Sequence, residues 1–352
     1  FLFWNISYSQ DFDILIISLL VDKIHIEKFL ILYMRLLLVY FLLFTQSWAL
    51  GQSCCSGSAP FANNINFGSV NQGMVIGLNY DYNNMNDFFS KRSSIEPHNY
   101  IRYSHASFLY VQSSIFEKFT IGVTVPYISH YRSSAFGNQS NELRSSGIGD
   151  PVVLLSYAVL TLSKNYLNLG IGVGLPIGVN DVKDAEFDLL LPIDLQPSIN
   201  SWTYLFSANY QRQGLLLPNI YLFSNLIFLT QSNGRRSGSD QTFRYGNEYQ
   251  FYSGLGVNLL GKKAILSPQI SVRLKMSSFD KLNNVNVESS GGFWSYLGVG
   301  TQLVFQKFTF FSLWEMPIYR SINGAQLTTS YRLRAGISLR FKYSKSNNYE
   351  TL

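Results

Sequence analysis

Histidine and serine are the residues of this chain that could carry out nucleophilic chemistry. His105 and Ser107 are two positions apart, so on a strand both side chains would point to the same face. A serine activated by such a histidine could hydrolyse a lipid ester. Neither residue stands in a recognisable nucleophile motif, and the sequence identifies no third residue to orient the histidine. We expect no enzymatic activity, with a lipid hydrolase as the less favoured alternative.

Three glycines, Gly170, Gly172 and Gly174, alternate along one segment and could suggest a phosphate-binding loop. That loop needs a further glycine followed by a helix. Leu175 and Pro176 occupy this place instead, inside a predicted strand. We interpret the glycines as positions that leave internal space or let the strand bend, and we expect no nucleotide or other cofactor.

Cys54 and Cys55 are the two cysteines of the sequence. They could carry a lipid, bind a soft metal or stay unmodified. The preceding residues lack the Leu-small-small pattern of a lipoprotein site, and no nearby histidine completes a set of metal ligands. We expect no metal site here.

The strongest indication of function is a set of charged residues that share one face of their predicted strands. These residues are Arg102, Arg273, Lys275, Glu315, Arg332, Arg334, Arg340 and Lys342. Rings of Arg or Lys select negative solutes, so the set predicts a basic constriction with few acids beside it. Strand pairing about the last long loop would place Glu315 roughly opposite Arg334. The alternative is that these side chains are polar because they face water or a plug.

A long acidic loop over residues 179–201 is the second candidate site. Its proposed constriction residues are Asp181, Asp184, Glu186, Phe187 and Asp188. The loop also holds Asp194 and more apolar residues than an exposed loop needs. We expect it to fold inward over the basic wall, attracted by opposite charge. An outer lid or a partner-binding loop is the alternative.

Composition restricts the elements that can position these residues. Of 352 residues, 47% are apolar and 16% aromatic, whereas only 14% are charged. An ordinary soluble domain has about 25% charged residues, which makes a cytosolic enzyme a poor fit. The many Tyr and Phe residues exclude a disordered chain. Past residue 51 no run reaches the ~20 apolar residues of a membrane-spanning helix, so a β-rich chain remains.

The N-terminal region differs from the rest of the chain. A positive start at Arg35, an apolar stretch and small residues at its end predict a secretory signal peptide over residues 34–51. Residues 1–33 would then be an upstream extension, and residues 52–72 an N-terminal periplasmic segment. A membrane anchor over Phe29–Phe44 is the alternative, although Arg35 interrupts it.

Apolar and small or polar residues alternate along the rest of the chain, which is typical of strands with two different faces. Leu169, Ile171 and Val173, for example, alternate with glycines. Twelve segments carry the pattern, at 73–82, 99–112, 117–131, 147–160, 167–178, 202–210, 218–230, 249–260, 266–276, 293–305, 308–318 and 331–343. Apolar residues on both faces of 308–318 predict a bulge there or a different strand register.

The connections between these segments alternate in length. The long ones are 83–98, 132–146, 179–201, 231–248, 277–292 and 319–330. Short periplasmic turns and longer outer loops are typical of bacterial outer-membrane barrels. Lipid offers no hydrogen bonds, so every strand edge must be paired. We predict an all-β fold, a closed antiparallel transmembrane β-barrel of about 12 strands over residues 73–343, with apolar side chains outward and a C-terminal tail at 344–352.

Four segments resemble an outer-membrane barrel family labelled as meta-pathway phenol degradation proteins. They are Gly147–Leu154, Leu169–Gly178, Gln196–Trp202 and Gly324–Leu327. The resemblance implies a transporter-like channel for small, often aromatic or hydrophobic compounds, and it carries over no catalytic residues. Such barrels usually end on an aromatic residue of the last strand. Here residues 344–352 follow, which bears on recognition by the barrel assembly machinery.

The sequence therefore predicts a passive outer-membrane channel of a Gram-negative bacterium for small aromatic, hydrophobic or anionic solutes. The expected partners are outer-membrane lipid, the barrel assembly machinery and a small-molecule solute. Nucleic acid is not expected, because the 27 Lys and Arg residues are scattered rather than clustered. The alternative is a plugged barrel that acts as a structural or surface-binding protein.

Overall fold

The computed structural model describes residues 73–96, 99–136, 139–235, 240–261 and 263–342. The predicted extension at 1–33, signal peptide at 34–51, periplasmic segment at 52–72, cysteines 54 and 55 and tail at 344–352 lie outside these residues. No helix in the described ranges is long and apolar enough to span a membrane.

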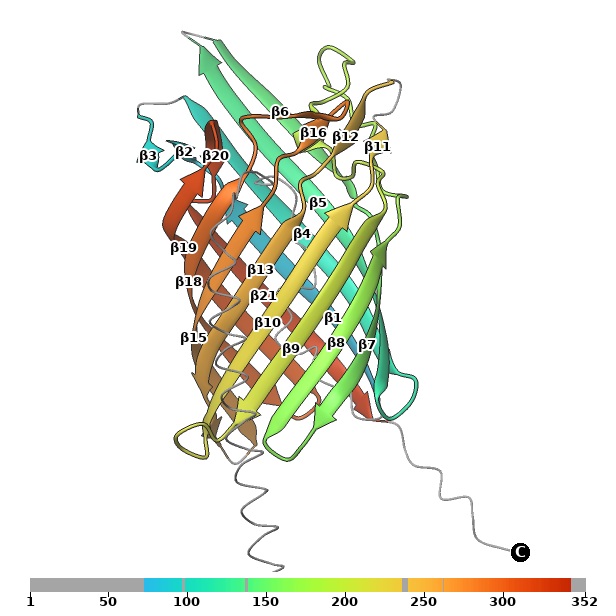
Figure 1. The fold of residues 1–352 in the computed structure, drawn as a ribbon, viewed down its shortest axis with the longest axis vertical. Coiled ribbons are helices and arrows are strands. Elements are labelled where there is room, and N and C mark those ends of the chain that lie inside the picture. The colour runs from blue at the N-terminus through green and yellow to red at the C-terminus, as the bar shows by residue number, and fades with distance from the viewer. Residues whose placement is uncertain (1–72, 97–98, 137–138, 236–239, 262, 343–352) are drawn as a thin grey trace, which may run out of the picture. The chain divides into compact units, whose positions relative to one another are not determined.

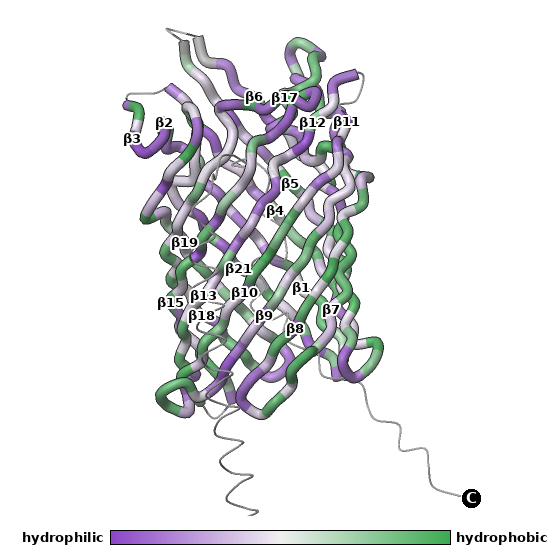
Figure 2. Tube along the Cα trace, viewed as in Figure 1, coloured by the Kyte–Doolittle hydropathy of each residue, from purple (hydrophilic) through white to green (hydrophobic). Residues whose placement is uncertain are grey.

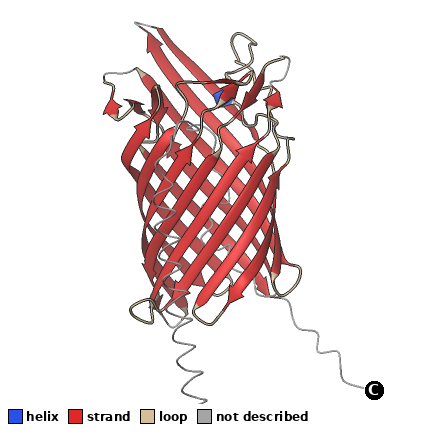
Figure 3. Cartoon of the chain, in the orientation of Figure 1, coloured by secondary structure: helices blue, strands red, loops and turns tan. Residues whose placement is uncertain are grey.

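Within the described residues, twelve long antiparallel strands form a closed barrel (Figures 1 and 3). They are β1 (Gly73–Asn84), β4 (Tyr100–Ser114), β5 (Phe119–Phe136), β7 (Val152–Thr161), β8 (Asn165–Gly174), β9 (Thr203–Gln213), β10 (Ile220–Gln231), β13 (Glu248–Val257), β15 (Ala264–Ser277), β18 (Gly292–Phe305), β19 (Phe308–Ile322) and β21 (Tyr331–Lys342). Each pairs with its neighbours along the chain, and β1 pairs with β21 to close the ring. The predicted fold class is confirmed.

The alternating residues point as a membrane barrel requires. On β1, Leu78 is 49% exposed on the outer face, whereas Asn79 beside it is 6% exposed on the inner face. On β8, Leu169 and Ile171 are likewise exposed, and Asn168 is buried. Figure 2 shows hydrophobic residues along the barrel wall and hydrophilic ones gathered at the end that carries the long loops. The apolar rows therefore form the outer surface rather than a core between two sheets.

Glycines on the inner face make room for aromatic rings from the neighbouring strand. A Cβ atom added to Gly77 would lie 2.4 Å from the ring of Tyr110, and one added to Gly256 would lie 2.2 Å from the ring of Tyr221. In both pairs the glycine and the aromatic residue are cross-strand partners. The rings thus cover backbone that would otherwise lack side-chain packing.

The long connections all lie at one end of the barrel, and they contain short strands. β2 (Asp87–Ser90), β3 (Ser93–Ser94) and β20 (Ala325–Thr328) form one small sheet. A second consists of β11 (Gly234–Arg235), β12 (Thr242–Arg244), β16 (Lys281–Leu282) and β17 (Val285–Asn286). The two-residue strand β14 (Leu259–Leu260) pairs with β15 near the opposite end of the barrel. The alternation of short and long connections agrees with the sequence prediction.

The prediction of a loop over residues 132–146 is wrong. β5 continues to Phe136 and pairs with β6 (Gln139–Ile148), so most of this segment is a hairpin that extends the wall. Its residues are polar on both faces, which removes the alternation used to find strands. The strand predicted over 147–160 is interrupted at residues 149–151, and β7 starts only at Val152.

The bulge predicted in the strand that starts at Phe308 is confirmed. The register between β18 and β19 shifts at Ser295 and Tyr296, which pair with Tyr319 and Pro317. Ile318 is left between them, and both Ile318 and Tyr319 are exposed. Past this point the faces of β19 exchange. The apolar residues on both faces lie before the shift, and the inward-facing Leu313 packs in a buried cluster with Tyr221, Phe223 and Tyr252.

Candidate solute pathway

One side of the inner wall carries a buried network of charges. Arg273 of β15 donates from Nε and Nη2 to the two carboxylate oxygens of Glu315 on β19, each at 3.0 Å. Arg334 of β21 forms an ion pair with the same carboxylate. Arg332 donates from Nε to Asp81 of β1 at 2.7 and 3.0 Å. These three predicted arginines therefore face the lumen, but each has an acid beside it, and Arg273 and Arg334 share the carboxylate of Glu315.

The network continues across β13. Lys275 Nζ lies 2.8 Å from Glu248 Oε2 and 5.7 Å from the ring centroid of Trp294. The guanidinium of Arg273 lies 4.1 Å from the ring centroid of Tyr296. Removing one partner of such a buried ion pair is costly, because the other charge is then left buried without a counter-charge. Arg340 has a different setting: it lies near the short-turn end, opposite Val75, and is exposed.

The opposite side of the inner wall carries an apolar patch. Val152, Leu154, Leu205 and Ile227 point inward from β7, β9 and β10 and pack together, with Leu229 beside them. These residues interrupt the polar face that the sequence prediction assigns to the lumen. The inner wall therefore has a charged network on one side and an apolar patch among polar residues on the other.

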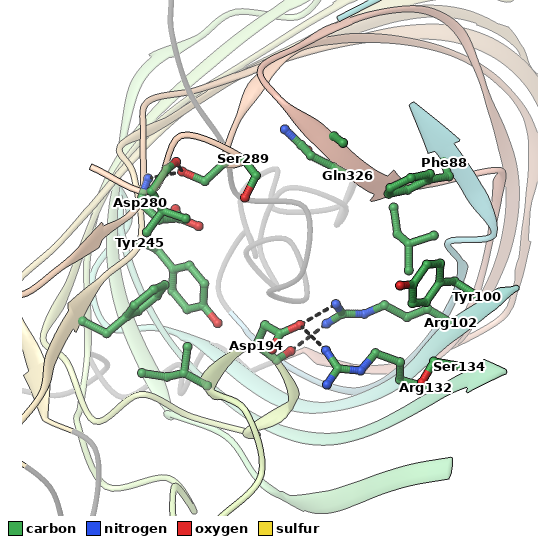
Figure 4. A pocket seen from close by; sticks show the side chains of 16 residues that line it. Phe88, Tyr100, Arg102, Arg132, Ser134, Asp194, Tyr245, Asp280, Ser289 and Gln326 are labelled. Carbon is green, nitrogen blue, oxygen red and sulfur yellow. Dashed lines mark hydrogen bonds and ion pairs between the residues drawn. The ribbon is translucent and has the colours of Figure 1, made fainter. Parts of the chain in front are cut away.

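The long loop between β8 and β9 contacts the inner wall through Asp194 of the 3-10 helix η1 (Ile193–Leu195) (Figure 4). Arg102 Nη1 donates to Asp194 Oδ2 at 2.6 Å, and Arg102 Nη2 donates to the Asp194 backbone oxygen at 2.7 Å. Arg132 Nη1 donates to Oδ2 at 3.3 Å. Burial raises the pKa of Asp194, but the charges of the two arginines lower it more, so this pKa lies below its ordinary value.

Packing and hydrogen bonds hold η1 in place. Leu191 and Leu195 are fully buried, and the Ser145 hydroxyl on β6 donates to the backbone oxygen of Leu195. Gln196 ties the loop to itself: its Nε2 donates to the oxygens of Val182 and Leu191 at 2.9 and 3.1 Å. The loop is thus a folded unit rather than a loose connection.

The five residues predicted to form a constriction lie at the tip of this loop. Asp181, Glu186, Phe187 and Asp188 are exposed, and Phe187 is 64% exposed. Asp184 Oδ1 accepts hydrogen bonds from the backbone N–H groups of Glu186 and Phe187 at 2.8 and 3.0 Å, so it shapes the turn. Their part in solute passage stays a prediction, and Asp194 is the acid of the loop that reaches the arginines.

A cavity of about 490 Å³ opens at the loop end of the barrel, bordered by Arg102, Arg132 and Asp194 (Figure 4). Two aromatic pairs from separate parts of the chain also line it. Phe88 and Tyr100 have ring centroids 5.9 Å apart, and Phe243 and Tyr245 have centroids 5.0 Å apart with edge-to-face rings. The volume is in the range of small-molecule sites, and the lining combines aromatic surface with a few charged groups.

Asp280 borders the same cavity from the loop after β15. Its Oδ1 accepts a hydrogen bond from the N–H of Gly246 at 2.8 Å. Burial is the main reason that the pKa of Asp280 rises to about 8. The hydrogen bond from Gly246 and the charge of Lys275 oppose the rise, whereas Glu248 and Asp194 add to it. A carboxyl with this pKa is mostly protonated at neutral pH.

His105 and Ser107, the pair considered for the less favoured hydrolase, do not line this cavity. His105 lies on the outer face of β4, where its Nδ1 and the Tyr80 hydroxyl form a hydrogen bond. Its ring lies 5.1 Å from Tyr82 and 5.4 Å from Tyr103 between centroids. Tyrosines and histidine at this height form an aromatic belt of the kind that lies at a membrane interface.

The described part of the chain contains no group of three or more His, Cys, Asp or Glu side chains placed to hold a metal ion. Several acids named above were missed by sequence reasoning. Asp81 lies on the inner face of β1, two residues after Asn79, so the alternation alone could have identified it. Glu248 fell within a predicted loop, one residue before a predicted strand.

No known family model matches the chain, and no curated protein matches it in sequence. Solved structures do match. An outer membrane channel from Pseudomonas putida F1 aligns with a TM-score of 0.61 and 14% identity, over 78% of this chain and 98% of that one. The beta domain of the Bordetella autotransporter BrkA aligns with a TM-score of 0.45 and 12% identity, over 77% of this chain and 100% of that one. The first match shows that the chain has the fold of an outer-membrane barrel.

Proposed function

We propose that this chain is an outer-membrane channel through which small solutes pass down their concentration gradient. The observation that carries the proposal is the closed barrel with apolar residues outside and a charged network and an apolar patch inside. Outward apolar rows match a bilayer, because a soluble barrel would expose them to water at a cost of roughly 25 cal/mol per Å². The matched solved structure is itself named an outer membrane channel.

The solutes that fit are small and carry an apolar body, with or without a negative charge. Phe88 of β2 and Tyr100 of β4 form one aromatic pair at the outer cavity, and Phe243 of β12 and the following Tyr245 form another. Two arginines line the same cavity. Further inside, the apolar patch around Leu154 and Leu205 offers a surface to a hydrophobic solute. Acids offset most of the positive charge opposite it, although Arg273 and Arg334 share the single carboxylate of Glu315.

A specific observation favours a second candidate, a plugged barrel with a structural or surface-binding role. Asp194 and Ser145 fasten η1 against the inner wall, and Leu191 and Leu195 of this loop are fully buried. A loop fixed in this way could close the mouth permanently. Under this alternative the outer loops would be the functional surface.

Liposome swelling separates the two. Vesicles containing the purified protein are placed in isotonic arabinose, phenol or sodium benzoate, with protein-free vesicles as the control. A channel predicts swelling that grows with the amount of protein and falls with solute size. No swelling above the control with any of these solutes would reject the channel and favour the plugged barrel.

A further inference from the structure

Two arginines lie side by side on neighbouring strands at the outer cavity. Arg102 of β4 and Arg132 of β5 are cross-strand partners, and both line the cavity. Like charges directly opposite on neighbouring strands repel each other. The pair therefore needs an anion beside it, and the carboxylate of Asp194 supplies one.

The way Asp194 binds leaves this anion site only partly filled. Oδ2 accepts from both arginines, but the contact with Arg132 is 3.3 Å, compared with 2.6 Å for Arg102. The side chains of Asp194 and Arg132 are 30% and 25% exposed, so both border the open cavity. In Figure 4 the two guanidinium groups and the carboxylate lie together at one edge of the open space.

We propose that Arg102 and Arg132 form a binding site for a small monocarboxylate with an apolar body, and that Asp194 occupies this site until such a solute displaces it. The inference rests on the proposed channel function and names one class of solute that the vestibule admits. Arginine forks match carboxylate geometry, and charge-assisted hydrogen bonds are about twice as strong as neutral ones. The pairs Phe88–Tyr100 and Phe243–Tyr245 would contact the apolar body.

Displacement of Asp194 by a solute would also affect the loop that carries it. Asp194 belongs to η1, so a carboxylate that takes its place on Arg102 and Arg132 removes the ion pairs that fasten η1 to the wall. The carboxylate of Asp194 competes with the solute for the arginines. The apparent affinity for the solute is therefore reduced in proportion to the fraction of time that Asp194 occupies the site. Removing the charge of residue 194 should therefore tighten solute binding.

The test is calorimetric titration of benzoate into the purified, folded barrel in detergent, with benzamide as the neutral analogue. Asp194→Asn should bind benzoate about tenfold more tightly than the wild-type chain, because its amide is a weaker competitor for the arginines. Adding Arg132→Gln to that variant should weaken benzoate binding about tenfold. Benzamide should bind all of these proteins alike.

Arg144→Gln is the matched control. Arg144 lies on the same extended hairpin, pairs with Glu142 at the surface and does not line the cavity. Folding of each variant is checked by its gel mobility before and after heating. Equal benzoate affinity in the wild type, Asp194→Asn and Asp194→Asn/Arg132→Gln would overturn the proposal, as would benzamide following benzoate.

Swelling in arabinose with the same proteins distinguishes this failure from failure of the channel. If arabinose causes swelling but benzoate binding ignores Arg132 and Asp194, the carboxylate site alone is rejected. If no solute causes swelling while benzoate binding follows both residues, the channel alone is rejected and the site stands.

Discussion

Arg332 on the last strand, β21, binds both carboxylate oxygens of Asp81 on the first strand, β1, and both side chains are 5% exposed. The pair spans the seam where the two ends of the barrel sequence meet. No turn joins β1 to β21, so the stability of this seam depends on backbone pairing and on side-chain contacts such as this ion pair. The ion pair is therefore placed to stabilise closure.

Asp81→Asn should weaken the seam. It leaves the buried Arg332 without its main counter-charge, which costs about 3–5 kcal/mol in comparable buried pairs. The free energy of unfolding, measured by urea titration in lipid vesicles, should fall by that order. Glu142→Gln breaks an ion pair whose side chains are 74% and 47% exposed and should cost less than about 1 kcal/mol. Equal losses in the two variants would contradict a special role for the seam pair.

Glu315→Gln should change ion selectivity. Glu315 is fully buried and contacts both Arg273 and Arg334, so neutralising it leaves two cations on one wall of the lumen without their shared acid. Rings of basic side chains favour anions. The reversal potential in a KCl gradient across a planar bilayer should shift toward chloride selectivity. A wild-type reversal potential in this variant would show that ions do not pass this wall.

Acid should release η1 from the wall. The pKa of Asp194 is lower in the folded protein than its ordinary value of about 3.9, so the ion pairs with Arg102 and Arg132 contribute stability above that pH. This contribution is lost as the pH falls through the lowered pKa. Proteolysis of the loop should therefore accelerate below about pH 4 in the wild type. The same acceleration in Asp194→Asn would mean that another group is responsible.

Asp280 should have the opposite pH dependence. Its pKa of about 8 in the folded protein lies above the ordinary value, so its stabilising contribution is present below about pH 4 and declines as the pH rises to 8. Asp280→Asn keeps an oxygen that can accept from Gly246. Relative to the wild type, the variant should gain stability between pH 5 and pH 9, by at least about 1 kcal/mol. A constant difference between these pH values in urea titrations would show that Asp280 ionises normally.

The strands could be predicted because a barrel wall with an apolar outer face and a polar inner face imposes a period of two on them. Apolar residues such as Leu78 and Ile171 had to point outward, which also fixed the direction of Asn79 and Arg334. Where the wall extends beyond the lipid, this constraint ends. The hairpin of β5 and β6 has mostly polar residues on both faces, so the alternation that predicts strands is absent from it.

The outer cavity could not be predicted in the same way. Its lining comes from loops far apart in the sequence, and the small strands β11, β12, β16 and β17 are too short to show a period. Asp194 lies in a loop whose path depends on packing of Leu191 and Leu195, so its contact with Arg102 leaves no local pattern. The arginines were found by their strand positions, whereas their acidic partners required knowledge of which strands lie side by side.

The orientation of the alternating residues is the central claim, and it can be measured directly. Cys54 and Cys55 are replaced by serine, and single cysteines at Leu78, Asn79, Ile270 and Ser271 are spin-labelled in lipid vesicles. Labels at Leu78 and Ile270 should collide mainly with oxygen, which dissolves in lipid, because both side chains are on the outer face. Labels at Asn79 and Ser271 should show low oxygen accessibility, because they point inward. High oxygen accessibility at Asn79 and Ser271 and low accessibility at Leu78 and Ile270 would contradict the barrel orientation on which the channel depends.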